Sequence, residues 1–117
     1  MSFKFENLLI WRRAMLLGEE INTIAGKFPV KEKFNLSTQI CRAADSIALN
    51  IAEGSIGQSN PEFRKFMGYA IRSLAEVVTC LHKAKRRNYI SEEIFQSLYN
   101  ASFNLMNMMV AFKKNIK

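Results

Sequence analysis

The residues of this sequence that could do chemistry are mainly cations, and they favour binding over catalysis. The 117 residues include 17 Lys and Arg against 10 Asp and Glu, a net charge of +7. Such an excess favours acidic partners, usually nucleic acids or anionic surfaces. The alternative is that the positive net charge serves only to keep the protein soluble. The cations that we expect to contact phosphate groups are Arg12, Arg13, Arg42, Arg64, Lys65, Arg72, Arg86 and Arg87.

Residues that usually act as nucleophiles, bases or metal ligands are too few here for an active site. His82 is the single histidine, and no cysteine lies at zinc-ligand spacing from it. Glu53 and Glu76 lack the Glu-x-x-His pattern of di-iron bundles. A structural role, such as pairing with Arg42 or Arg72, is therefore favoured for both acids. We expect no enzyme activity, no metal and no cofactor.

The cysteines and the N-terminal residues indicate the cellular compartment in which the protein is expected. Cys41 and Cys80 show no CxxC spacing. Buried free thiols in a reducing cytoplasm explain such a pair better than a disulfide does. The N-terminal residues 1–6 lack the long apolar stretch after a basic region that marks a signal peptide. We therefore expect a cytoplasmic protein.

Apolar residues at steps of three and four predict helices along nearly the whole chain. With 49% hydrophobic residues, five Gly and two Pro, the sequence indicates one domain over residues 1–117. The connections are too short for crossovers, which predicts an all-α, up-down-up-down antiparallel four-helix bundle. Phe28 and Phe34 are expected to anchor the first connection onto it. The helices are expected to run from a cap at Asn7 to about Ala25, from Asn35 or Ser37 to near Gly54, from Asn60 to the basic run at 83–87, and from Ser91 to about Phe112.

The fourth helix has no charged residue between Ile94 and Phe112. A membrane span of roughly 20 residues must be considered, but the Asn, Gln and Ser residues inside it would be costly in lipid. Its expected core positions are Ile94, Leu98, Ala101, Leu105, Met108 and Phe112. A second apolar strip lies beside them, and one core cannot cover both. We therefore expect a subunit interface formed by Phe95, Tyr99, Met106 and Met109.

The stretch from Gln39 to Gly54 combines an apolar helix face with a polar seam of Ser46, Asn50 and Glu53. It resembles the hallmark Gln-x-x-Arg-Ala-x-x-Ser-Ile-x-x-Asn-Ile-Ala-Glu-Gly of small four-helix-bundle proteins encoded in intervening sequences of bacterial 23S rRNA genes. That family includes the accessory variability protein of diversity-generating retroelements. Cys41 and Arg72 depart from its pattern. The matching residues are Gln39, Arg42, Ala43, Ser46, Ile47, Asn50, Ile51, Ala52, Glu53 and Gly54.

The resemblance implies a homopentamer and favours nucleic-acid binding without catalysis, with RNA favoured over DNA. The polar residues of the fourth helix argue against membrane association. The net charge of +7 independently favours nucleic-acid binding. The alternative is a protein-interaction scaffold, for example for a reverse transcriptase, as the retroelement member implies. Binding to RNA that weakens with salt would distinguish the first function from the second.

Overall fold

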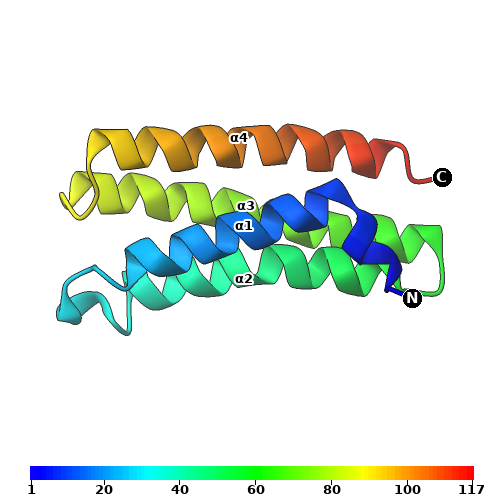
Figure 1. Cartoon of the computed structure of the whole chain (residues 1–117), viewed down its shortest axis with the longest axis horizontal. Coiled ribbons are helices and arrows are strands. Elements are labelled where there is room, and N and C mark those ends of the chain that lie inside the picture. Colours follow the sequence, from blue (N-terminus) through cyan, green and yellow to red (C-terminus); the bar gives the residue numbers. More distant parts are fainter.

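The computed structural model describes residues 1–117 and contains four long helices and no strand. Helices that follow one another in the chain lie side by side and antiparallel, and α4 returns to lie beside α1 (Figure 1). This arrangement confirms the predicted all-α, up-down-up-down four-helix bundle. The elements are η1 (Lys4–Asn7), α1 (Leu9–Ala25), η2 (Val30–Glu32), α2 (Leu36–Ser55), α3 (Asn60–Arg86) and α4 (Glu92–Lys114).

The helix starts show which side chains act as caps. The Ser59 hydroxyl accepts a hydrogen bond from the Glu62 N–H, and Ser91 accepts one from the Ile94 N–H. Both bonds satisfy amides that a helix start otherwise leaves unpaired. The helix α3 begins at Asn60 as expected, and Ser59 is its cap. The expected cap at Asn7 is wrong, because Asn7 ends η1 and α1 begins at Leu9 without a side-chain cap.

The apolar residues that recur at steps of three and four in the first three helices lie largely in the core. In α2 the apolar face from Leu36 to Ile51 is buried. In α3 the buried residues follow a heptad repeat of Phe63, Met67, Ala70, Leu74, Val77, Leu81 and Ala84. Their side chains form one cluster with the inner residues of α1. Because the period of these residues is close to 3.5, each helix keeps one face toward its neighbours along its length.

The predicted core positions of α4 are partly wrong. Phe95 and Met109 are buried in the chain's own core, whereas Ile94 is 42% exposed and Ala101 lies at the surface. Ser102 is also buried, and its hydroxyl donates to the Leu98 carbonyl, which satisfies it. We therefore remove Phe95 and Met109 from the predicted interface, because neither offers surface to a second chain. The buried face of α4 consists of Phe95, Leu98, Ser102, Leu105 and Met109.

The connection between α1 and α2 is anchored by one of its two phenylalanines. Phe28 is buried against the bundle and its ring lies 5.4 Å from the ring of Tyr89, whereas Phe34 is 89% exposed. Of the two phenylalanines, only Phe28 therefore anchors this connection, and the expected contact of Phe34 with the bundle is wrong. None of the four long helices combines the length and the apolar content that a membrane crossing requires.

Gly54 marks the closest approach of α2 to α3. A Cβ atom at this position would lie 2.8 Å from Cβ of Phe66 and 2.9 Å from Cδ1 of Phe63. Real Cβ atoms do not come so close, because a contact of this length is strongly repulsive. The absent side chain is therefore what allows the end of α2 to pack against the start of α3.

We expect Gly54→Ala to lower the free energy of unfolding by about 1–3 kcal/mol, the usual cost of overpacking. Gly18→Ala is the matched control. Gly18 is also a buried helical glycine, but its added Cβ would meet its nearest atom, the Ala44 carbonyl oxygen, at 3.8 Å. This control should gain roughly 0.5–1 kcal/mol from its better helix propensity. Urea denaturation followed by circular dichroism measures both, and equal stabilities for the two variants would contradict the packing argument.

Candidate nucleic-acid interface

The eight cations predicted to bind phosphate do not share one surface. Arg12 and Arg13 are on α1, which is diagonally opposite α3 in the bundle, and the backbones of the two helices do not approach each other closely. Lys65 and Arg72 are on the exposed side of α3. A single polyanion on one face of the monomer therefore cannot contact all eight.

Three of these cations form bonds within the chain. Arg64 donates to the Ile116 carbonyl at 3.0 Å, Arg12 donates to the Glu6 carbonyl at 2.8 Å, and Arg87 lies 3.1 Å from a carboxylate oxygen of Glu32. Each of these bonds limits how freely the side chain can turn toward a ligand. The remaining five side chains are exposed and form no hydrogen bond or salt bridge within the chain. They are Arg13, Arg42, Lys65, Arg72 and Arg86.

The structure concentrates the positive charge at the two ends of a bundle that is 43 Å long. One end holds both the α1–α2 and the α3–α4 connections, and we call it the basic end. Its seven cations against three acids give it a net charge of +4. The basic end carries Lys27, Lys31, Lys33, Lys83, Lys85, Arg86 and Arg87, with the acids Glu32, Glu92 and Glu93.

The opposite end holds both termini and the α2–α3 connection, and seven cations against three acids give it a net charge of +4. The middle has Arg13, Arg42 and Arg72 against four acids, a net charge of −1. A polyanion is therefore attracted most strongly to the ends. The opposite end carries Lys4, Arg12, Arg64, Lys65, Lys113, Lys114 and Lys117, with the acids Glu6, Glu53 and Glu62, and the acids of the middle are Glu19, Glu20, Asp45 and Glu76.

Glu32 is the residue that sequence reasoning missed. Its side chain is 5% exposed, yet it accepts hydrogen bonds from the Tyr89 hydroxyl at 2.6 Å, from Arg87 at 3.1 Å and from the Asn35 amide at 3.1 Å. It also accepts a longer bond from the backbone N–H of Leu36, at the start of α2. A buried carboxylate with this many donors is satisfied as an anion.

The Glu32 bonds join the two connections at the basic end. They bring the lysines on either side of Glu32 next to the end of α3, although Glu32 and Tyr89 are 57 positions apart. The hydrogen bond from Tyr89, helped by Arg87 and Asn35, lowers the pKa of the Glu32 carboxyl. The same bond raises the pKa of the Tyr89 phenol. The only sequence signal was an acid between two lysines in a short connection.

A second polar cluster lies between α2 and α3, where the family-like stretch meets its neighbour. The hydroxyls of Ser46 and Ser73 form a hydrogen bond, and the Asn50 amide donates to the Ser46 carbonyl at 2.8 Å. Arg42 lies one turn before Ser46 on α2, and Arg72 directly precedes Ser73 on α3. No acid pairs with either arginine, so the expected pairing with Glu53 or Glu76 is not formed.

The structure shows no cluster of three or more His, Cys, Asp or Glu side chains that could hold a metal ion. His82 is exposed and packs its ring against Phe95 at 4.9 Å and Tyr99 at 6.1 Å. Cys41 and Cys80 are free thiols, one half-buried and the other buried. The polar surface therefore offers cations and hydrogen-bond donors as its main binding groups.

Comparison with known proteins gives two findings. Residues 6–111 match the sequence profile of a family described as 23S rRNA-intervening sequence protein. Among solved structures, a similar fold occurs in the crystal structure of a protein of unknown function from the S23 ribosomal protein family of Bacteroides thetaiotaomicron. Its TM-score is 0.85 at 24% identity, over 92% of this chain and 96% of that chain, which shows a shared fold. A comparison with curated proteins finds no match.

The lowered pKa of Glu32 predicts how stability depends on pH. A carboxyl whose pKa is lower in the folded than in the unfolded state contributes stability above its ordinary pKa of 4.5, and this contribution is lost as pH falls below it. Glu32→Gln should therefore have a lower Tm than the wild type at neutral pH. The difference in Tm should begin to shrink as pH falls below 4.5, because the carboxyl of the unfolded chain takes up a proton first. It should vanish once pH is below the lowered pKa of the folded carboxyl.

The matched control is Glu92→Gln. Glu92 also forms a salt bridge, to Lys85 at 2.6 Å, but its side chain is 65% exposed, so its loss should leave Tm nearly unchanged. Thermal melts across the acid range compare the three proteins. A Glu32→Gln variant as stable as the wild type at neutral pH would contradict a structural role for this carboxylate.

Proposed function

Since the chain belongs to the 23S rRNA-intervening sequence protein family, we propose that it is a non-enzymatic RNA-binding bundle that acts as a homo-oligomer. The observation that carries the proposal is the concentration of unpaired cations at both ends of the bundle. Only Lys85 and Arg87, of 17 Lys and Arg, lie in salt bridges. The charges of the other cations are not neutralised by a salt bridge, although Arg12 and Arg64 donate to backbone carbonyls.

Phosphate binding needs cations that are exposed and not already neutralised, and it releases counterions from the nucleic acid. The basic end meets this condition with Lys31 of the first connection and Arg86 at the end of α3, which are both exposed. Contacts of this kind position a nucleic acid but do not read its sequence. The proposed binding is therefore strong at low salt and weak in sequence preference.

Phe34 adds an aromatic surface to the basic end. Its exposed ring lies beside Lys33, whose ammonium is 5.4 Å from the ring centroid. An unpaired base can stack on such a ring while neighbouring cations hold its phosphates, and this mode of binding tolerates any base. RNA hairpin loops and single strands offer unpaired bases, which is a second reason to favour RNA over duplex DNA.

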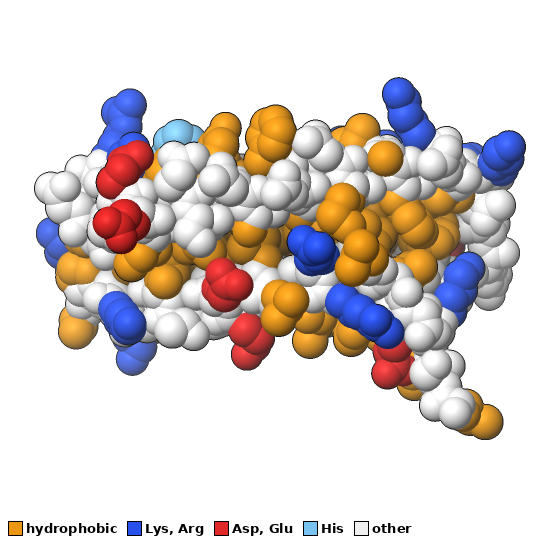
Figure 2. Space-filling model, turned by 45° about the horizontal axis from the view of Figure 1, so that its top comes forward, with side chains coloured by type: hydrophobic (Ala, Val, Ile, Leu, Met, Phe, Trp, Pro, Cys, Tyr) orange, Lys and Arg blue, Asp and Glu red, His pale blue; other side chains and the backbone are white.

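Self-association is the second part of the proposal, and it rests on exposed apolar side chains. Figure 2 shows hydrophobic side chains along the groove between α4 and α1, where Leu16 is 63% exposed. On the other side of α4, Tyr99 and Met106 line a groove of about 270 Å³ with Phe103, which is 56% exposed. Patches of this kind usually mark interfaces.

The resemblance implies five copies, and side-by-side packing would place like ends together. Each end of such an assembly would combine the positive charge of several chains, which increases its attraction for a polyanion at long range. The same apolar grooves would also suit a protein partner such as a reverse transcriptase. This scaffold function is the alternative if RNA does not bind.

The first test removes charge from the basic end. Lys31→Gln with Arg86→Gln should weaken binding to an RNA hairpin in mobility-shift titrations at low salt. The dependence of log affinity on log salt should become shallower by about one for each lost phosphate contact. Two hairpins of equal length and unrelated sequence should compete equally for the wild type.

The matched control is Asn100→Asp with Asn104→Asp, which lowers the net charge by the same amount on the exposed side of α4. Asn100 accepts a hydrogen bond from Gln96 through its side-chain oxygen, and Asp keeps this acceptor. Equal weakening by both double variants would show an effect of total charge alone. No binding by the wild type at low salt would remove the RNA function and leave the protein scaffold.

The second test concerns assembly. Met106→Lys, Tyr99→Lys and Phe103→Lys should each lower the mass measured by light scattering at micromolar concentration, because a cation in an apolar contact is costly to bury. Phe103 is the most informative position, because its side chain is largely exposed. A lysine there should not unfold the single chain, so a lower mass would report a lost contact between chains. Asn107→Lys, an exposed polar position on the same helix, is the control. A monomeric wild type would contradict self-association.

A further inference from the structure

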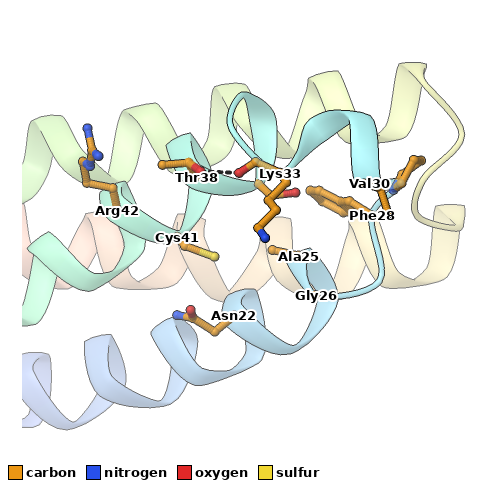
Figure 3. Close-up of a pocket in the computed structure, with 11 residues that line it drawn as sticks. Asn22, Ala25, Gly26, Phe28, Val30, Lys33, Thr38, Cys41 and Arg42 are labelled. Carbon is orange, nitrogen blue, oxygen red and sulfur yellow. Dashed lines mark hydrogen bonds between the residues drawn. The ribbon is translucent and has the colours of Figure 1, made fainter.

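A pocket of about 600 Å³ lies where the end of α1 and the first connection meet the start of α2 (Figure 3). We propose that it binds a small organic anion whose charged group meets Lys33 and whose apolar body lies against Ala25, Phe28 and Cys41. The volume is within the range of about 300–1,000 Å³ that is typical of ligand pockets. The pocket shares Lys33 with the basic end, but the proposal does not depend on RNA binding.

The charges around the pocket select an anion. Lys33 and Arg42 are its two charged lining residues, no Asp or Glu lines it, and neither cation forms a salt bridge. In Figure 3 the Lys33 ammonium points into the pocket, toward Ala25 and Cys41, whereas the Arg42 guanidinium points away from it at the rim. The ligand's charge is therefore assigned to Lys33.

Hydrogen bonds hold the frame around Lys33. The Thr38 hydroxyl donates to the Lys33 carbonyl, which fixes the backbone of this residue against the first turn of α2. Asn22 is held by bonds from its amide to the Gly18 carbonyl and to Asp45. The Ser37 hydroxyl has no partner within the chain, so it can serve a ligand. A cation on a fixed backbone binds with a smaller loss of conformational freedom.

Ala25, Phe28 and Cys41 form an uncharged, mainly apolar part of the wall, and the nearby Asp45 carboxylate, which does not line the pocket, accepts a hydrogen bond from Asn22. Ala25 and Phe28 are buried, and the Phe28 ring is supported from behind by Tyr89. Burial, with a further contribution from Asp45, raises the pKa of the Cys41 thiol, so it is neutral at pH 7 and does not repel an anion. An inorganic anion would leave this wall in contact with water. An anion with an apolar body covers it and gains hydrophobic stabilisation.

The probe for this site is naphthalenesulfonate, compared with the neutral naphthylmethanol. Titration into the wild-type protein, followed by NMR, should shift the amide signals of Lys33, Ser37 and Cys41. Bound sulfonate should slow alkylation of Cys41 by N-ethylmaleimide, while Cys80 is buried elsewhere and reports general unfolding. Naphthylmethanol should bind roughly tenfold more weakly, the difference expected from one charge-assisted hydrogen bond.

Lys33→Gln should weaken sulfonate binding by the same factor of roughly ten. Lys31→Gln is the matched control, because it removes the same charge from the same connection at an exposed residue that does not line the pocket. Equal losses in both variants, equal affinity for the neutral probe, or unprotected Cys41 would each overturn the proposal. The variant Lys31→Gln with Arg86→Gln should lose RNA affinity and keep sulfonate binding, which separates the two functions.

Discussion

The buried carboxylate of Glu32 is the interaction on which one whole end of this molecule depends. It receives hydrogen bonds from Asn35 beside α2 and from Arg87 and Tyr89 beyond α3, so it joins two connections that are distant in sequence. A buried charge is tolerated only when donors surround it, and here the donors come from both connections. The first connection is consequently held against the bundle, where it forms one wall of the anion pocket.

The same interaction explains why the positive charge gathers where it does. Glu32 neutralises Arg87, which lies next to Arg86 and the lysines of α3, but Glu32 is itself buried and offers no negative surface. The neighbouring Lys31 and Lys33 therefore remain exposed without a surface acid between them. Repulsion among these cations is partly offset by the C-terminus of α3, where the helix dipole favours positive charge.

The fourth helix packs against α1 and α3, and these two neighbours do not cover all of its apolar side chains. The aromatic rings of Phe95, Tyr99 and Phe103 follow one another along it at 5.7 and 6.3 Å. The first ring is buried and the last lies largely in solvent. An apolar ladder that passes from the core to the surface is suited to continue into a second chain, which is the physical basis for the proposed self-association.

The sequence by itself determined the helices, their antiparallel order and the buried faces of α2 and α3. Each of these follows from local periodicity, from Gly54 and Pro61 at the turns, and from connections too short to cross the bundle. The rotation of α4 about its axis was decided only by the tertiary structure. Its two apolar strips, which begin at Ile94 and Phe95, are similar enough in hydrophobicity that either could have faced the core. Whether Phe95 or Ile94 turned inward depended on the shape of the neighbouring helices. The positions of the charges along the helices could be read from the sequence. The Glu32 bonds and the pocket could not, because they join residues whose separation in the chain carries no signal of contact.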